Sequence, residues 1–111
     1  MTVTIEPGKI HYSLGCIETA YPVLEAREIG RLVVVVYDYM SFPQDKPARN
    51  LFAYDRHTGK EEWRAQDIGL GQTDAYTKIL SDAPLLVGNF ASYICRVDPR
   101  NGRVIEKEFT K

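Results

Sequence analysis

The segment Ala53-Tyr54-Asp55-Arg56-His57-Thr58-Gly59-Lys60-Glu61-Glu62-Trp63 decides the fold of this chain. Asp55 can cap the backbone of a tight turn with its carboxylate, and Gly59 can adopt the positive φ that ends such a turn. Trp63 then supplies a large apolar anchor on the returning strand. The segment therefore predicts a β-hairpin that is anchored by Trp63. It indicates an architecture and not an activity.

A weaker copy of this segment follows downstream. Asp98 and Gly102 repeat the Asp-x-x-x-Gly spacing, and each lies 43 residues after its counterpart. A shared offset of this size is typical of a structural repeat. The copy keeps apolar and basic character at several positions, but Glu106 stands at the tryptophan position. We therefore expect two related units, about 20–66 and 75–110.

The first copy resembles the repeat of quinoprotein-type β-propellers, the A-x-D-x-x-T-G-x-x-x-W pattern of pyrroloquinoline-quinone dehydrogenases and related cofactor-free propellers. Its marked positions are occupied by Ala53, Asp55, Thr58, Gly59 and Trp63. In that family these residues shape each blade and dock it on its neighbour, whereas residues scattered over many blades hold the quinone. The resemblance therefore implies blade-like units and no quinone.

The second copy carries a looser resemblance. The segment 93–109 is similar to the closing segment of small, uncharacterised bacterial proteins with one degenerate blade pair. A bacterial source follows from this resemblance alone. Counting both copies, the likeness to known repeats covers about half of the chain.

Composition indicates one domain over residues 1–111. With 44% hydrophobic residues, a chain of this length can bury roughly two thirds of its unfolded surface. The 14 basic and 15 acidic residues nearly cancel, so neither a nucleic-acid partner nor a membrane surface is expected. The N-terminus lacks the apolar core of a secretory signal, and no apolar run is long enough to span a bilayer. We therefore expect a cytoplasmic protein.

The pattern of apolar residues predicts an all-β fold, because no window has helical periodicity and β-branched and aromatic residues are frequent. We expect an opening hairpin over 3–14 that turns at Pro7-Gly8, followed by two four-stranded antiparallel units. Their strands are predicted at 21–29, 31–39, 50–55 and 60–66, and at 75–80, 84–89, 92–98 and 103–110. The run 32–36 is apolar on both faces, which predicts a central strand covered on both sides.

Two units are too few to close a propeller ring, which takes about four to eight blades. The chain is therefore expected to form a propeller fragment, or to fold back into a flattened sandwich or barrel with the hairpin as a lid. Association of two copies would also cover the open ends, and we expect a two-fold homodimer.

No constellation typical of catalysis occurs in the sequence. His11 and His57 are not spaced with carboxylates or cysteines as metal ligands would be, and no nucleophile elbow, P-loop or dinucleotide-binding glycine pattern is present. Cys16 and Cys95 lie among apolar neighbours, so buried free thiols are expected rather than a disulfide. We therefore expect no catalytic residues, no metal and no cofactor.

One connection is longer than its counterpart in the second unit. From Asp38 to Asp55 the chain takes 17 steps, whereas from Gly88 to Asp98 it takes 10. Extra length is either a neutral insertion or a place for function. Aromatic anchors inside a polar rim are typical of a contact loop. The predicted partner-binding residues are Tyr39, Met40, Phe42, Lys46, Arg49 and, on the shorter connection, Phe90.

Two alternatives accompany this interpretation of the loops. Met40 and Phe42 would instead cap the core if they fold over the end of the sheet. If both connections emerge on one edge, their aromatic residues form a single surface.

Three classes of function are open at this point. The first is a non-enzymatic protein-interaction module, an immunity or inhibitor partner of another bacterial protein, and the long aromatic loop favours it. The second is a self-assembling structural protein. The third is a cofactor-binding, quinoprotein-related enzyme subunit, which needs a pocket built from more blades than this chain encodes.

Overall fold

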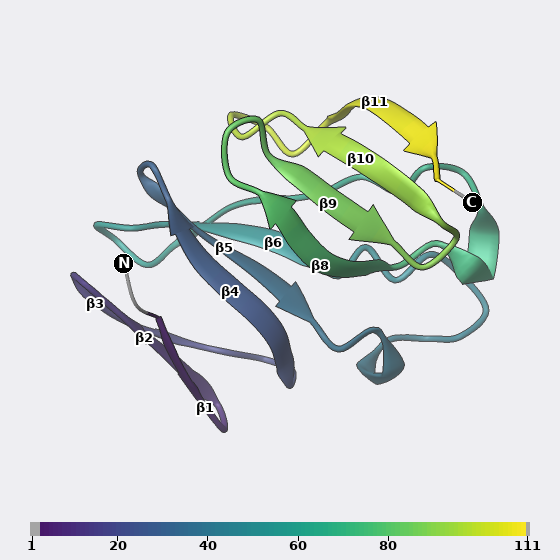
Figure 1. The fold of residues 1–111 in the computed structure, drawn as a ribbon. Helices are drawn as coiled ribbons and strands as arrows, with labels where there is room; N and C mark the ends of the chain where they lie inside the picture. Colours follow the sequence, from purple (N-terminus) through teal and green to yellow (C-terminus); the bar gives the residue numbers. More distant parts are fainter. Residues whose placement is uncertain (1–2, 111) are drawn as a thin grey trace.

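Three antiparallel β-sheets make up the computed structural model, which describes residues 3–110 (Figure 1). The N-terminal sheet has the order β1-β2-β3, with bounds Thr4–Glu6, Lys9–Tyr12 and Gly15–Glu18. The first unit has the order β4-β5-β6-β7, with bounds Val23–Ile29, Leu32–Tyr37, Leu51–Asp55 and Glu61–Arg64. The second unit has the order β8-β9-β10-β11, with bounds Tyr76–Ser81, Leu86–Asn89, Tyr93–Val97 and Val104–Phe109. Two short 3-10 turns, η1 at Tyr39–Ser41 and η2 at Gly71–Thr73, lie in the connections.

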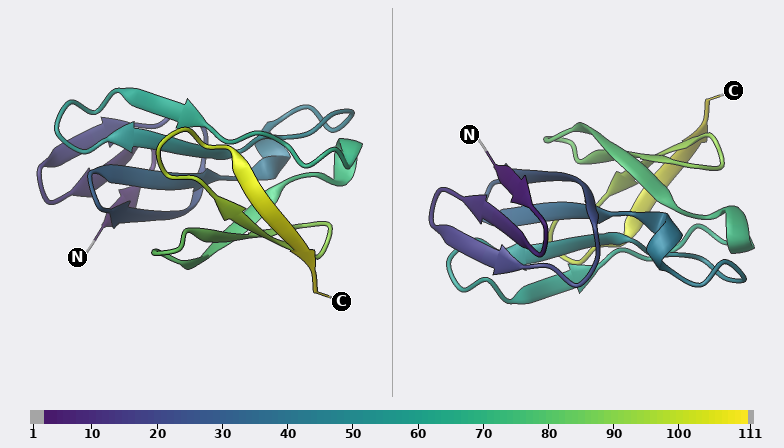
Figure 2. Two further views of the ribbon diagram at one scale, coloured as in Figure 1. Left: turned by 90° about the horizontal axis from the view of Figure 1, so that it is seen from above. Right: turned by 90° about the horizontal axis from the view of Figure 1, so that it is seen from below.

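The two predicted four-stranded units are confirmed, and all eight strands begin and end within three residues of the expected bounds. The N-terminal element is larger than the predicted hairpin, because β3 adds a third strand after a tight turn at Ser13-Leu14. β3 has one buried residue, Ile17, so its sequence shows no alternation to detect. The sheets stack in layers and no barrel closes among the described residues (Figure 2).

The first unit is the middle layer, and its strand β5 is buried along its whole length. Leu32, Val34 and Val36 pack into the core shared with the second unit. Val33 and Val35 point the other way, into the core shared with the N-terminal sheet. The prediction of a central strand covered on both faces is therefore confirmed.

The two Asp-x-x-x-Gly segments form the same turn. Asp55 Oδ1 accepts hydrogen bonds from the backbone N–H groups of His57 and Thr58, at 2.8 and 2.9 Å. In both turns the glycine N–H donates to the aspartate carbonyl at 2.8 Å, and the glycine φ is 75° at Gly59 and 76° at Gly102. The backbone hydrogen bonds from Thr58 and His57 lower the pKa of Asp55 below its ordinary value.

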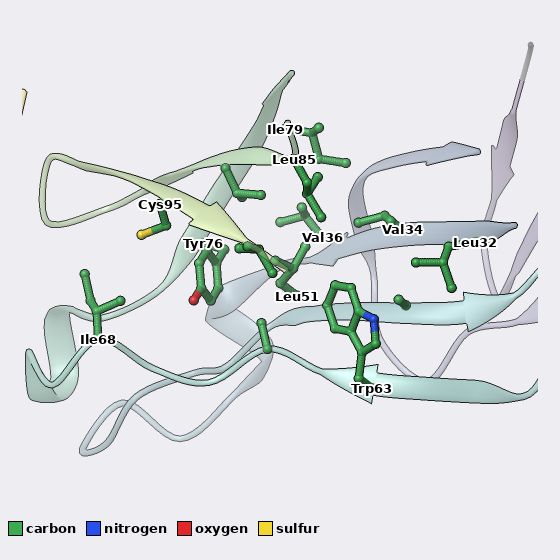
Figure 3. Packing of buried hydrophobic residues seen from close by; sticks show 14 residues of the cluster. Leu32, Val34, Val36, Leu51, Trp63, Ile68, Tyr76, Ile79, Leu85 and Cys95 are labelled. Atoms are coloured by element: carbon green, nitrogen blue, oxygen red, sulfur yellow. The ribbon is translucent and has the colours of Figure 1, made fainter. Parts of the chain in front are cut away.

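Trp63 joins the first unit to the second. Its indole is buried against Gly102, where an added Cβ would lie 2.6 Å from Trp63 Cε3. Trp63 Nε1 donates a hydrogen bond to the carbonyl of Pro99 at 2.8 Å. Around this contact, side chains from both units converge on one core (Figure 3). Removing a buried tryptophan of this kind costs about 3–5 kcal/mol.

The N-terminal sheet docks on the first unit in the same way. Tyr12 Oη donates to the carbonyl of Arg56 at 2.8 Å, and Arg56 lies 43 residues before Pro99. Ile17 Cγ1 would lie 3.9 Å from a Cβ at Gly59, the counterpart of Gly102. A similar docking contact therefore occurs at the N-terminal sheet, although its sequence lacks the motif.

The second unit has no docking residue at the position that corresponds to Trp63. Glu106 stands in place of the tryptophan and forms an exposed ion pair with Arg96, at 3.6 Å. The position that holds a buried indole in the first unit thus holds an exposed charge in the second.

Glu28 on β4 ties the turn between β2 and β3 to the first unit. Its carboxylate accepts hydrogen bonds from the backbone N–H and the hydroxyl of Ser13, and Arg56 Nη1 lies 3.8 Å away. Burial opposes ionisation of this side chain, but the two Ser13 hydrogen bonds and Arg56 outweigh it and lower the pKa of Glu28. The N-terminal sheet is thus held by a charged contact as well as by its core.

The two cysteines differ in their exposure to solvent. Cys95 is buried and free, and burial raises the pKa of its thiol to about 11. Cys16 is also free but is exposed, so the prediction that it is buried is wrong. It lies on the outward face of β3, opposite His11 and away from the core.

The two turn glycines offer a matched test of the docking contact. Gly59→Ala is expected to cost about 1–2 kcal/mol, because alanine is strained at positive φ. Gly102→Ala is expected to cost about 1–3 kcal/mol more, because its methyl group also overlaps the Trp63 ring. Urea unfolding of both variants measures the difference. Equal losses would show that the ring moves away freely.

Glu28 predicts an acid-sensitive contact. Its folded-state pKa lies below the ordinary value of 4.5, so its stabilising contribution is present above that value and is lost as the pH falls through the folded-state pKa. We expect the free-energy difference between wild type and Glu28→Gln to shrink between about pH 7 and pH 3. Urea unfolding across this range tests it, and a pH-independent difference would contradict the assignment.

Candidate interaction surface

The long connection of the first unit and the short connection of the second emerge at the same end of the molecule. The rings of Tyr39 and Phe90 meet there, with centroids 5.5 Å apart. Met40 is 65% exposed and Phe90 is 56% exposed. We call Tyr39, Met40 and Phe90 the loop-end surface. The predicted joining of the two connections is thus present in the structure.

Local hydrogen bonds fix the start of the long connection. The Asp38 carboxylate accepts from the backbone N–H of Met40 at 2.9 Å and caps the 3-10 turn η1. The N–H of Phe42 closes the turn on the carbonyl of Tyr39. The exposed side chains of η1 are therefore presented by an ordered backbone.

Phe42 lies beneath this turn and not on the surface. Its side chain is 7% exposed and packs on Tyr21, with ring centroids 4.4 Å apart. The guanidinium of Arg64 covers the ring at 5.6 Å. Phe42 therefore caps the core, as the alternative interpretation held, and its side chain is not available to a partner. Met40 does not share this role.

Arg49 is also turned inward. It has a positive φ of 47°, and its Nε donates to the carbonyl of Ala65 at 3.1 Å. Its own carbonyl accepts from Arg64 Nε at 2.8 Å, so the two arginines tie the end of the loop to the end of β7. Lys46 is exposed at the middle of the connection. Of the two predicted cations, Lys46 is exposed and Arg49 is half-buried.

A buried polar network supports the loops and joins the two units. Asn50 donates to the carbonyls of Tyr37 and Tyr76, and its Oδ1 accepts from the N–H of Tyr76. Asp74 accepts from Asn89 at 2.9 Å and from the N–H of Ile68 at 2.6 Å. Buried polar groups are costly unless paired, and paired in this way they fix one arrangement of the chain.

Sequence reasoning missed Asn50, Asp74 and Asn89. Each lies at an expected strand end, where a polar residue is ordinarily a solvated turn residue. No spacing connects them, because the network is assembled from three connections that meet only after folding. Their burial is visible in the tertiary structure alone.

Residues 3–110 contain neither a metal-ligand cluster nor a membrane-spanning helix. Among residues 3–110, no three His, Cys, Asp or Glu side chains lie close enough to hold a metal ion. In the same part of the chain, no helix has the length and apolar character needed to cross a bilayer.

The fold and the loop-end surface define an all-β protein of stacked antiparallel sheets. Residues 9–109 match the family described as Domain of unknown function (DUF7957), and the chain belongs to that family. No curated protein matches the chain.

A solved structure is similar to the whole chain. It is the crystal structure of the computationally designed Ika8 protein, with a TM-score of 0.60 and 12% sequence identity. The similarity covers 98% of this chain and 36% of the designed one, so this chain spans about a third of its length. At this identity the likeness concerns the fold alone.

Phe42 and Phe90 have opposite expected effects on stability. Phe42→Ala is expected to cost about 3–5 kcal/mol, because it removes a buried ring from the core. Phe90→Ala is expected to change the free energy of unfolding by no more than about 1 kcal/mol, since its ring is mostly exposed. Chemical denaturation distinguishes them. A large loss for Phe90→Ala would make it a structural residue.

Proposed function

We propose that this protein is a non-enzymatic interaction module that binds a protein partner through the loop-end surface. One observation carries the proposal: two connections from different units bring Tyr39 and Phe90 into contact and leave Phe90 and Met40 largely exposed. Aromatic residues and methionine are enriched at protein interfaces. The proposed site therefore consists of Tyr39, Met40 and Phe90, with Lys46 on its polar rim.

The support beneath these side chains favours binding. Burying an exposed apolar side chain gains about 25 cal/mol per Å², but a loop that must become ordered loses much of this gain. Here the capped turn η1, the buried ring of Phe42 and the Asn50 network already fix the backbone. Because the backbone is already ordered in the free protein, little conformational entropy is lost when a partner binds. Anchor residues on such a backbone contribute most of their burial energy to binding.

Self-assembly is the second candidate, and the edge strand β11 opposes its simplest form. In a two-fold antiparallel pairing of β11 with its own copy, each side chain stays on the face of the sheet that it occupies now. A register centred on Lys107 places Lys107 opposite Lys107 and Glu106 opposite Glu108. A register centred on Glu106 places Glu106 opposite Glu106. Like charges directly opposite are destabilising. The homodimer stays a prediction, and β11 is not the strand that would form it.

A quinoprotein-related enzyme has less support. Residues 3–110 supply two four-stranded units and one three-stranded sheet, whereas the family that the motif resembles holds the quinone with residues from many blades. The motif residues have structural partners here: Asp55 holds a turn and Trp63 holds an interface. Asp55 and Trp63 therefore have structural roles in this protein.

The loop-end surface is tested by removing its exposed members together. Met40→Ser with Phe90→Ser is expected to leave the urea midpoint nearly unchanged and to weaken partner binding at least tenfold, since anchors carry binding energy without much fold stability. The partner is first identified by quantitative capture from the native host, and its affinity for each variant is then measured by calorimetry.

A matched control uses exposed apolar residues elsewhere. Leu14→Ser with Leu24→Ser removes two side chains of similar exposure from the N-terminal sheet and β4. This variant is expected to bind the partner like wild type. Equal affinity of wild type and the Met40, Phe90 variant would refute the proposed surface.

A further inference from the structure

A groove opens between the first and the second unit, at the end of the molecule opposite the loop-end surface. It has a volume of about 500 Å³, and small-molecule sites usually have roughly 300–1,000 Å³. Its walls are the turn between β4 and β5, the turn between β8 and β9, and the turn between β10 and β11. The strand β5 joins the two ends, because Leu32 lines the groove at its start and η1 follows its end.

Apolar side chains form the floor of this groove and part of its walls. Leu32, Leu85 and Val97 are at most 3% exposed, so the floor is the surface of the core between the two units. Pro84 is exposed in one wall, and Ile105 is 55% exposed in another. Covering this surface with an apolar group removes it from water, which favours binding. The groove therefore suits the apolar part of a small molecule.

Backbone groups of the groove already have hydrogen-bond partners within the protein. The carbonyl of Arg31 accepts from the N–H of Arg56, and the carbonyl of Leu85 accepts from the N–H of Val97. An added polypeptide strand needs a row of free backbone N–H and C=O groups. These positions offer no such row, so a polar ligand group is recognised here by side chains.

Four charged side chains line the groove, and hydrogen bonds already engage two of them. The Asp82 carboxylate accepts from Arg27 Nη1 at 2.9 Å. Arg100 donates to the Asp98 carboxylate from Nε and Nη2, at 3.2 and 3.0 Å. Asp82 and Arg100 are therefore paired within the protein, and the other two charged side chains are Arg31 and Arg96.

Arg31 and Arg96 are paired more loosely. Their Nη1 atoms lie 3.4 and 3.6 Å from the carboxylates of Glu62 and Glu106, whereas an N–H···O hydrogen bond measures about 2.7–3.2 Å. Neither glutamate lines the groove. Exposed ion pairs of this kind contribute little to stability, and each guanidinium has five N–H donors in a fork that matches a carboxylate. Both side chains can therefore bind an anion without breaking a strong contact.

We propose that this groove binds a small carboxylic acid with an apolar body. Arg31 of the first unit and Arg96 of the second bind the carboxylate, and the apolar body lies over Leu85 and beside Ile105. The two guanidiniums and the apolar floor are complementary to the two parts of such a molecule. This site is distinct from the loop-end surface and does not depend on the proposed function.

The test compares octanoate with the uncharged 1-octanol and with acetate, by two-dimensional NMR of the labelled full chain. Octanoate is expected to give saturable shifts confined to residues 29–32, 82–85, 96–97, 99–100 and 105. Octanol, which lacks the charge, is expected to bind at least tenfold more weakly. Acetate, which lacks the apolar body, is expected to bind at least tenfold more weakly as well.

A double variant tests the two arginines. Arg31→Gln with Arg96→Gln is expected to weaken octanoate binding at least tenfold and to leave octanol binding unchanged. Both residues are exposed, so the variant is expected to fold. The matched control, Lys60→Gln with Arg103→Gln, removes two exposed cations that follow the turn glycines and lie outside the groove. It is expected to bind octanoate like wild type, which separates the two arginines from an effect of net charge.

The proposal is overturned if octanoate gives no saturable shifts, if its shifts centre on other residues, or if octanol binds equally well. Wild-type affinity of the Arg31, Arg96 variant for octanoate would overturn it too. Groove shifts that grow with protein concentration in the absence of any probe would assign the groove to a second copy of the chain, and so would also contradict the proposal.

Discussion

The contact between Trp63 and Gly102 holds the two four-stranded units together. It requires a glycine for two reasons: the turn needs a positive φ, and the indole occupies the space that a Cβ would fill. The hydrogen bond from Trp63 Nε1 to Pro99 fixes the orientation of the ring. A large side chain on one sheet thus packs on the backbone turn of the next.

A similar contact occurs at the N-terminal sheet, and the anchor is absent from the second unit. Tyr12 and Ile17 reproduce it between the N-terminal sheet and the first unit. Glu106 replaces the anchor on the second unit, where its charge faces solvent. Residues 3–110 therefore form three stacked layers. The outward face of the N-terminal sheet carries mostly exposed residues, as does the outer face of the second unit.

Stacking of the two units brings equivalent connections to one end, and the proposed loop-end surface arises from this order. The loop-end surface exists because Tyr39 and Phe90 lie on connections of neighbouring units. Among residues 3–110, β1 and β11 are both edge strands of their sheets, and like charges on β11 oppose its self-pairing.

The sequence by itself determined the local structure: the two aspartate turns, the eight strands of the repeats, and the burial of β5 on both faces. These features depend on turn chemistry and apolar patterning over a few residues, which any chain with this sequence would share. Tertiary structure alone decided that Phe42 and Arg49 face inward, that Cys16 faces solvent, and that the N-terminal sheet docks through a similar contact. Burial of a loop side chain depends on what lies across from it, and docking of Tyr12 on Arg56 joins residues 44 positions apart. Such contacts leave no periodic trace in the sequence, because nothing but the folded arrangement brings the two groups together.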